Sequence, residues 1–179
     1  MTPTTVEIAL IGFVLACAVG AAMLKDVLAS VMSFAAYSLG VSIIWLVLQA
    51  PDVGLTEAAV GAGIMTILFL LALANTVRPD EDRLFEPVSV RTVLGVGVFV
   101  AVMAATVPAL PAIGDPTAPV TGGEVTQYYI ENAYDQTGVH NAVTAVLAAY
   151  RGFDTLGEAV VVFVAGIAAL SVLRQEVFA

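Results

Sequence analysis

Long uncharged stretches dominate the hydrophobic pattern of this chain, and charges or turn residues bound each one. A helix needs about 20 apolar residues to cross a hydrocarbon core of about 30 Å. Five stretches of roughly that length lie at residues 8–24, 27–51, 58–75, 92–114 and 159–173. The pattern therefore predicts an all-α integral membrane protein with about five transmembrane helices.

The first stretch differs from a removable signal peptide. No Lys or Arg precedes it, and only Lys25 and Asp26 separate it from the second stretch. A signal peptide begins with a basic region and is not followed at once by a second full-length apolar run. We therefore expect the first helix to remain in the membrane.

Basic residues divide unequally between the two sides that five alternating helices define. Loops on the more basic side of a membrane protein face the cytoplasm. This predicts a multi-pass cell-membrane protein with its N-terminus outside and its C-terminus inside. Residues 78–91 then form a cytoplasmic linker between a three-helix part, 1–77, and a two-helix part, 92–179. The basic residues on the inner side are Lys25, Arg78, Arg83, Arg91 and Arg174, against Arg151 on the outer side.

The outer segment at residues 111–150 changes character at Glu124. Its first third is rich in Pro and Gly, which predicts a loop. From Glu124 onward, aromatic and aliphatic residues recur at helical intervals, among them Tyr128 and Tyr134. Tyrosines favour the membrane–water interface, so we predict a short amphipathic helix lying on the outer surface.

Composition agrees with a membrane location and narrows the possible partners. The chain has 60% hydrophobic and 12% charged residues, whereas soluble domains have roughly a quarter charged residues. Fifteen acidic and six basic residues give a net charge of -9, which argues against a nucleic-acid partner. Cys17 is the single cysteine, so we expect no internal disulfide, no Cys-based metal or iron–sulfur site, and no bound cofactor.

Glu57 follows a tight helix start at Pro51 and Asp52, and it precedes uninterrupted apolar sequence. A carboxylate is costly in lipid, so it must face protein, water or an ion. This makes Glu57 a candidate ion-pathway residue. The alternative is a carboxylate of the first helical turn, stabilised by the helix dipole at the headgroups.

Gly61 and Gly63 lie one turn further along the same helix. Small residues let neighbouring membrane helices approach closely, which is the ordinary interpretation of this pair. A π-bulge, a local widening of the helix that often marks a functional site, is the second interpretation.

The start of the fifth helix carries the second group of carboxylates. Asp154 suits an N-cap position, and Glu158 follows four residues later on the same helix face. Like charges at this spacing repel, so one group holds a proton or both share a cation, unless Arg151 compensates them. We assign Asp154 and Glu158 to the candidate ion pathway, because capping alone does not explain Glu158.

His140 is the single histidine, and it lies in the segment predicted to form the interfacial helix. A lone histidine at an interface is more often a surface hydrogen-bonding residue than a proton relay. It is kept as a candidate member of the ion pathway.

These stretches resemble a known group of membrane subunits. The run from Pro51 to Glu57, with the Gly-Ala-Gly at 61–63, resembles the D subunit of membrane-bound hydrogenases. The run from Arg151 to Glu158, with residues 138–143 upstream, resembles their E subunit. Both modules also occur fused in the A subunit of Mrp-type Na+/H+ antiporters. The three-helix part is more distantly similar to the J subunit of respiratory complex I, whose third helix carries a π-bulge.

The resemblance implies a non-catalytic membrane subunit that helps to form a Na+ or H+ path beside antiporter-like and other small subunits. Glu57 matches the hydrogenase D subunit, whereas many antiporter A subunits have Gln there and a Glu where this chain has Gly61. An Mrp-type antiporter is the first hypothesis, and a membrane-bound hydrogenase or related ferredoxin-linked ion pump is the alternative.

Two other classes of protein are alternatives. An intramembrane aspartyl protease needs two aspartates deep within helices, whereas the aspartates here lie at helix ends. A structural scaffold predicts that transport survives neutralisation of every membrane carboxylate.

Overall fold

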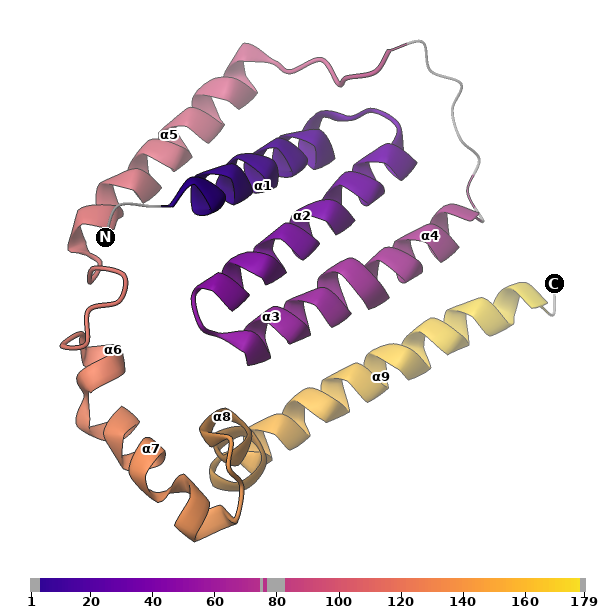
Figure 1. The fold of residues 1–179 in the computed structure, drawn as a ribbon. Helices are drawn as coiled ribbons and strands as arrows, with labels where there is room; N and C mark the ends of the chain where they lie inside the picture. The colour runs from indigo at the N-terminus through magenta and orange to yellow at the C-terminus, as the bar shows by residue number, and fades with distance from the viewer. Residues whose placement is uncertain (1–3, 75, 77–82, 178–179) are drawn as a thin grey trace. The chain divides into compact units, whose positions relative to one another are not determined.

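The structure is a computed structural model that describes residues 4–74, 76 and 83–177. Every regular element in these ranges is a helix (Figure 1). The all-α prediction is therefore confirmed, while part of the expected linker, residues 78–82, lies outside the described ranges. The elements are α1 Thr5–Met23, α2 Val27–Val47, α3 Pro51–Glu57, η1 Ala58–Met65, α4 Thr66–Ala74, α5 Val90–Thr106, η2 Val107–Ala109, α6 Pro119–Gly122, α7 Glu124–Thr137, α8 Ala142–Ala145, η3 Val146–Tyr150 and α9 Gly152–Val177.

Five helices in the described residues are long and apolar enough to cross a membrane, as the sequence predicts. The third runs continuously through α3, η1 and α4, so it begins at Pro51 and includes Glu57 within its length. The five candidate spans are Thr5–Met23, Val27–Val47, Pro51–Ala74, Val90–Ala109 and Gly152–Ser171.

Local polar chemistry explains where the first three helices begin. Thr4 and Glu7 form a capping box in which each side chain accepts a hydrogen bond from the backbone N–H of the other. Asp26 caps α2 by accepting from the N–H groups of Leu28 and Ala29, each at 3.3 Å. Pro51 occupies the first turn of α3, where its missing N–H costs nothing.

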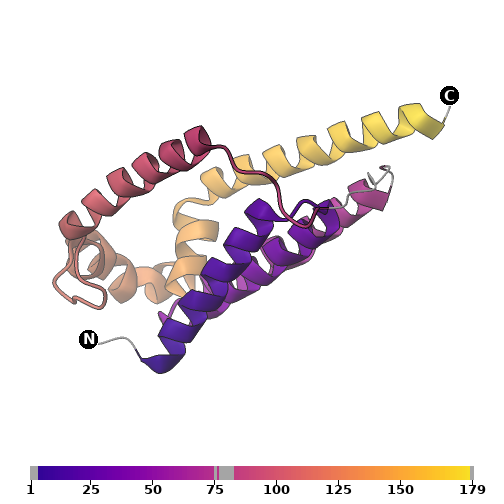
Figure 2. The ribbon, with the colours of Figure 1, turned by 90° about the horizontal axis from the view of Figure 1, so that it is seen from above.

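The chain divides into two compact units, residues 1–101 and 102–179, and each is described by itself. In the first unit, α1, α2 and the third helix lie side by side as an antiparallel layer (Figures 1 and 2). Gly40 allows α1 to approach α2, because an added Cβ would lie 2.7 Å from Val14 Cγ2 and 3.2 Å from the Phe13 ring.

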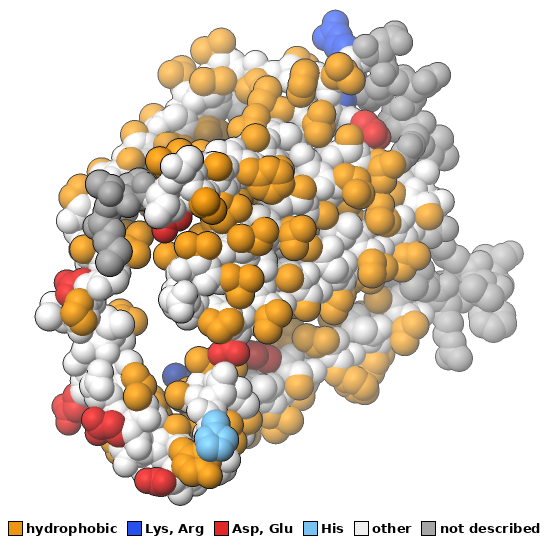
Figure 3. Space-filling view, viewed as in Figure 1, with side chains coloured by type: hydrophobic (Ala, Val, Ile, Leu, Met, Phe, Trp, Pro, Cys, Tyr) orange, Lys and Arg blue, Asp and Glu red, His pale blue; other side chains and the backbone are white. Residues whose placement is uncertain are grey.

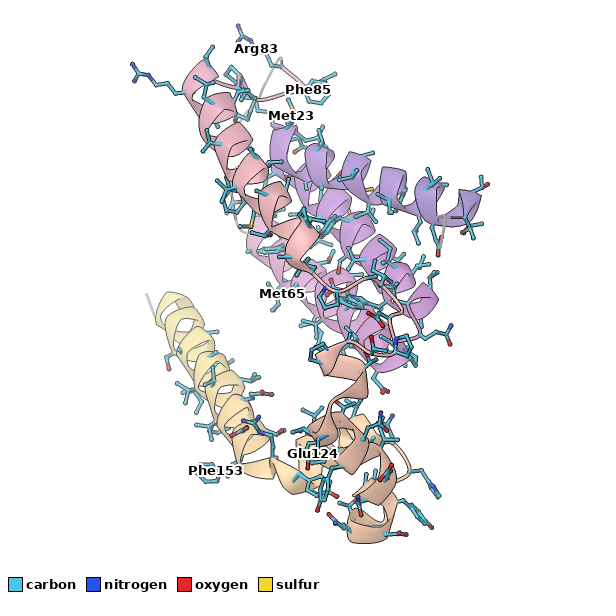
Figure 4. All side chains as sticks on the ribbon, turned by 90° about the vertical axis from the view of Figure 1, so that its left-hand side faces the viewer. Met23, Met65, Arg83, Phe85, Glu124 and Phe153 are labelled. Carbon is cyan, nitrogen blue, oxygen red and sulfur yellow. The ribbon has the colours of Figure 1, made fainter. Side chains whose placement is uncertain are left out.

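A short backbone bridge joins the turn after α1 to the segment before α5. Leu24 and Phe85 form an isolated antiparallel β-bridge. The Lys25 N–H donates to Leu84 O at 3.0 Å, and the Glu86 N–H donates to Met23 O at 2.9 Å. Figure 4 shows Met23 and Phe85 at this point. The bridge fixes residues 84–86 against the first turn.

The second unit contains the outer segment predicted from sequence. A helix begins at Glu124 as expected, but it ends at Thr137 instead of continuing to Tyr150. Gly138 adopts a left-handed conformation with φ 72°, which ends α7, and Asn141 then caps α8 by accepting from Thr144 N at 2.9 Å. The Pro/Gly-rich part forms a loop except for the single turn α6.

Large apolar side chains cover the outside of the helices rather than a central core. Figure 3 shows them spread over α1 to α4. None of the described residues in the α5 and α9 spans is buried. The buried polar residues lie instead between the helices of the first unit: Ser38, Ser42 and Thr66.

Candidate functional site

Glu57 lies at the end of α3, where the third helix faces α2. Its side chain is half-buried, and its Oε1 accepts a hydrogen bond from the Ser38 hydroxyl at 2.5 Å. Ser38 is fully buried in the middle of α2. The carboxylate therefore faces protein rather than lipid, which meets the requirement for a charged group within a membrane helix.

The helix widens directly after Glu57, where Ala58–Met65 form the π-helical segment η1. A π-helix shifts the backbone hydrogen bonds by one residue, and such segments are frequent at functional sites. The Thr66 hydroxyl donates to Gly61 O at 3.1 Å, so this side chain supplements the altered backbone pattern.

Gly61 and Gly63 have different surroundings within η1. An added Cβ at Gly61 would overlap the Ser38 hydroxyl and lie 2.8 Å from Glu57 Oε1. At Gly63 the nearest atom to an added Cβ is Ala58 O at 3.5 Å, an ordinary contact. Gly61 therefore provides close packing against α2 within a π-helical segment, and Gly63 provides no comparable contact.

At the second group, α9 begins at Gly152, so Asp154 lies within the first turn and is not the N-cap that the sequence suggests. The Arg151 Nε donates to Asp154 Oδ2 at 2.6 Å, and Nη2 lies at the same distance. Both side chains are more than half exposed, so this ion pair contributes about 0–1 kcal/mol to the stability of the fold. Arg151 thus compensates Asp154, one of the alternatives that the sequence leaves open.

Glu158 follows Asp154 by four residues on the same face of α9. Its side chain is exposed, and within the described part of the chain it forms no hydrogen bond or ion pair. The Thr155 hydroxyl between them donates to Leu147 O at 2.7 Å and ties the start of α9 to η3. Glu158 is therefore an exposed carboxylate within the fifth candidate span.

His140 lies in the turn between α7 and α8 and is exposed. Its ring stacks on Tyr134 with centroids 4.2 Å apart and planes 18° apart. A separate aromatic cluster before α9 consists of Tyr128, Tyr129 and Tyr150. In it, Gln136 Nε2 donates to the Tyr128 hydroxyl at 2.9 Å, and the Tyr150 hydroxyl donates to Gln136 Oε1 at 2.6 Å. Partial burial raises the pKa of Tyr150 above 10.0, with smaller contributions from Tyr128 and Tyr129.

The structure places Glu57 beside Gly61, whereas Asp154 and Glu158 share one face of α9. These two pairs lie in different units, so a joint acidic cluster remains a prediction. Sequence reasoning missed Ser38, Ser42 and Thr66. A signal was present, because Ser38 and Ser42 are four residues apart in an apolar run and so share one helix face.

Comparison with known proteins matches both parts of the chain. The MbhD family, described as the D subunit of MBH, matches residues 12–78, and the MbhE family, described as the E subunit of MBH, matches residues 90–177. Na(+)/H(+) antiporter subunit A1 of Staphylococcus aureus strains JH9, Newman and N315 is 31% identical over 153 residues. The alignment covers 84% of this chain, and the chain spans 18% of the length of these relatives.

Proposed function

Because the chain belongs to the MBH group of membrane subunits, with an MbhD part followed by an MbhE part, we propose that it is a membrane subunit of a multisubunit Mrp-type Na+/H+ antiporter. One observation carries this proposal. A single alignment to an antiporter subunit runs through both parts of the chain. This favours antiport over the redox-driven alternative.

The proposed role is to help form the ion path beside antiporter-like and other small subunits. It is a transport role without catalysis. Glu57 supports it, because a carboxylate turned toward protein inside a membrane helix is typical of ion and proton routes. Glu158 supports it for the complementary reason, since its exposed carboxylate requires a group that these residues do not supply.

The proposed orientation places the N-terminus outside and the C-terminus in the cytoplasm. The distribution of basic residues supports it, because Lys25, Arg83 and Arg91 lie at the opposite side from Arg151 when the five spans alternate. In this arrangement the third helix and α9 run inward together.

This orientation gives the two glutamates a common depth. Glu57 is the seventh residue of its helix and Glu158 is the seventh of α9. At about 1.5 Å per residue, each lies about 9 Å from its helix start. We propose that Glu57, Asp154, Glu158 and His140 each contribute to the outer part of the ion path.

The first experiment asks whether the chain is needed for antiport. The complex is expressed with and without this subunit in cells that lack other Na+/H+ antiporters, and Na+-induced collapse of a pH gradient is measured in everted vesicles. We expect the collapse to require the subunit. Full antiport activity without this subunit would refute the proposal.

The second experiment replaces the carboxylates. We expect Glu57→Gln and Glu158→Gln each to lower flux by about tenfold or more, equivalent to about 1.4 kcal/mol in the barrier. Asp154→Asn should have an intermediate effect, because Arg151 already neutralises that group in part. Blotting confirms subunit content. Wild-type flux in the Glu57/Glu158 double variant would support the scaffold hypothesis instead.

A further inference from the structure

Two buried serines on one face of α2 donate hydrogen bonds to the third helix, but their acceptors differ. Ser42 donates to the backbone carbonyl of Gly54 at 2.7 Å. Ser38 donates to the side chain of Glu57 at 2.5 Å. The Ser42 contact joins two helices, whereas the Ser38 contact also acts on an ionisable group. The two serines are thus a natural pair for comparison.

The backbone near Ser38 does not compete strongly for its hydroxyl. The Glu57 backbone carbonyl lies 3.4 Å from Ser38 Oγ, a much longer contact than the 2.5 Å to Oε1. The Gly61 carbonyl in η1 already accepts from Thr66 at 3.1 Å. The Ser38 proton is therefore directed at the carboxylate.

Gly61 creates the space in which this contact forms. A Cβ at this position would overlap the Ser38 hydroxyl and lie 2.8 Å from Glu57 Oε1. The absence of a side chain at Gly61 thus leaves room for the Glu57 carboxylate to contact Ser38. A buried hydroxyl, a carboxylate and a missing side chain together define one conformation of Glu57.

We propose that Ser38 is a positioning residue for the ion path: its hydroxyl holds the Glu57 carboxylate against α2, in the space left by Gly61. The inference rests on the proposed function of Glu57. Ser38 acts through Glu57, and it is the hydrogen-bond donor that a carboxylate needs when it leaves water.

The test is infrared difference spectroscopy on membranes that contain the full chain with its partner subunits. The band of Glu57 is identified as the carboxyl signal that Glu57→Gln removes. We expect the carboxylate stretch of Glu57 to change frequency in Ser38→Ala, because the hydrogen-bond donor is lost. Ser38→Cys should shift it less in the same direction, because a thiol is a weak donor. Ser42→Ala should leave the band in place.

Na+-dependent flux is measured on the same membranes. We expect Ser38→Ala to lower flux by about tenfold, the change that loss of a hydrogen bond to a charged group produces. An unchanged Glu57 band in both Ser38 variants would overturn the inference, as would an equal shift in Ser42→Ala. A shifted band in Ser38→Ala together with wild-type flux in Glu57→Gln would refute the proposed role of Glu57 in the ion path. The hydrogen bond between Ser38 and Glu57 would then be structural.

Discussion

Gly61 lies against Ser38 of α2, one of the three buried polar residues in the described part of the first unit. Ser38 and Ser42 donate hydrogen bonds from α2 to the third helix, and Thr66 donates one within the third helix. A buried polar group without a partner costs about 1–3 kcal/mol, so these hydrogen bonds favour one packing of α2 against the third helix. At the scale of single residues, stability and the geometry of Glu57 depend on the same few atoms.

The first prediction is that Gly61→Ala destabilises the packing of η1 against α2. Its Cβ would overlap the Ser38 hydroxyl, so either the serine or the helix must move. Overpacking of this kind costs about 1–3 kcal/mol. We expect a lower midpoint of thermal unfolding and a lower content of the subunit in membranes, measured by fluorescence-detected chromatography at increasing temperature.

Gly63→Ala is the matched control, because its added Cβ meets only an ordinary contact at 3.5 Å. It should unfold within a few degrees of the wild type. Equal loss in both variants would show that η1 needs glycine for its backbone and not for its distance from α2.

At the scale of secondary structure, both π-helical segments lie close to carboxylates. The segment η1 directly follows Glu57, and η3 comes shortly before Asp154. Each has a threonine hydroxyl that donates to a carbonyl within it, Thr66 to Gly61 and Thr155 to Leu147. Each hydroxyl stabilises a widened helical turn by a hydrogen bond to the backbone, which an apolar side chain could not form. In both segments a threonine side chain thus adds a hydrogen bond where the backbone pattern departs from α-helical spacing.

Helix starts were predictable, whereas the widening at η1 was only the second of two interpretations of Gly61 and Gly63. Charges, prolines and capping residues mark the starts of α2 and α3, and the apolar runs give their lengths. The residues of η1 are all compatible with an α-helix, so no local signal demands a π-helix. The break at Gly138 was predictable from the glycine and from Asn141, but the helical spacing of later valines concealed it. The contact of Ser38 with Glu57 depends on packing between helices, which a single sequence does not specify.

The second prediction concerns the direction of the spans. Cys17 is first replaced by Ala, and single cysteines are then placed at Thr117 and Glu86. A membrane-impermeant maleimide added outside intact cells should label the cysteine at position 117 but not the one at 86, because basic residues gather on the side of Glu86. Labelling after permeabilisation shows that both positions react. The reverse pattern would overturn the proposed orientation.

The third prediction concerns the link between α7 and the start of α9. The pKa of Tyr150 is raised by burial, so the neutral phenol persists above the ordinary value of 10.0. Its hydrogen bond to Gln136 stabilises the link fully below pH 10 and is lost as pH rises through the higher pKa in the folded state. Tyrosinate absorbance, taken as wild type minus Tyr150→Phe, should therefore titrate with a midpoint above 10. A midpoint at or below 10 would contradict the burial.

At the scale of the whole molecule, exposed apolar surface is the dominant feature. The α5 and α9 spans have no buried residue in the described ranges, and Phe153 at the start of α9 is 85% exposed (Figure 4). Lipid can cover the apolar side chains, but it cannot satisfy Glu158. The chain therefore has the surface expected of a part within a larger membrane assembly.

The fourth prediction follows from that surface. The polypeptide reconstituted alone in proteoliposomes should show no Na+-dependent or proton-dependent flux above empty vesicles, because its few polar groups cannot enclose a gated path. Co-reconstitution with the partner subunits should restore flux. Flux from the single polypeptide would contradict the subunit assignment.

The bridge between Leu24 and Phe85 also sets an order of events during biosynthesis. Its backbone donors and acceptors are roughly 60 residues apart along the chain. At a translation rate of about 5–20 residues per second, the turn after α1 waits roughly 3 to 12 s for its partner strand. The first three helices are therefore synthesised completely before residues 84–86 can pair with the turn after α1. A chain that stalls before Leu84 contains all three helices but lacks the backbone bridge between Leu24 and Phe85.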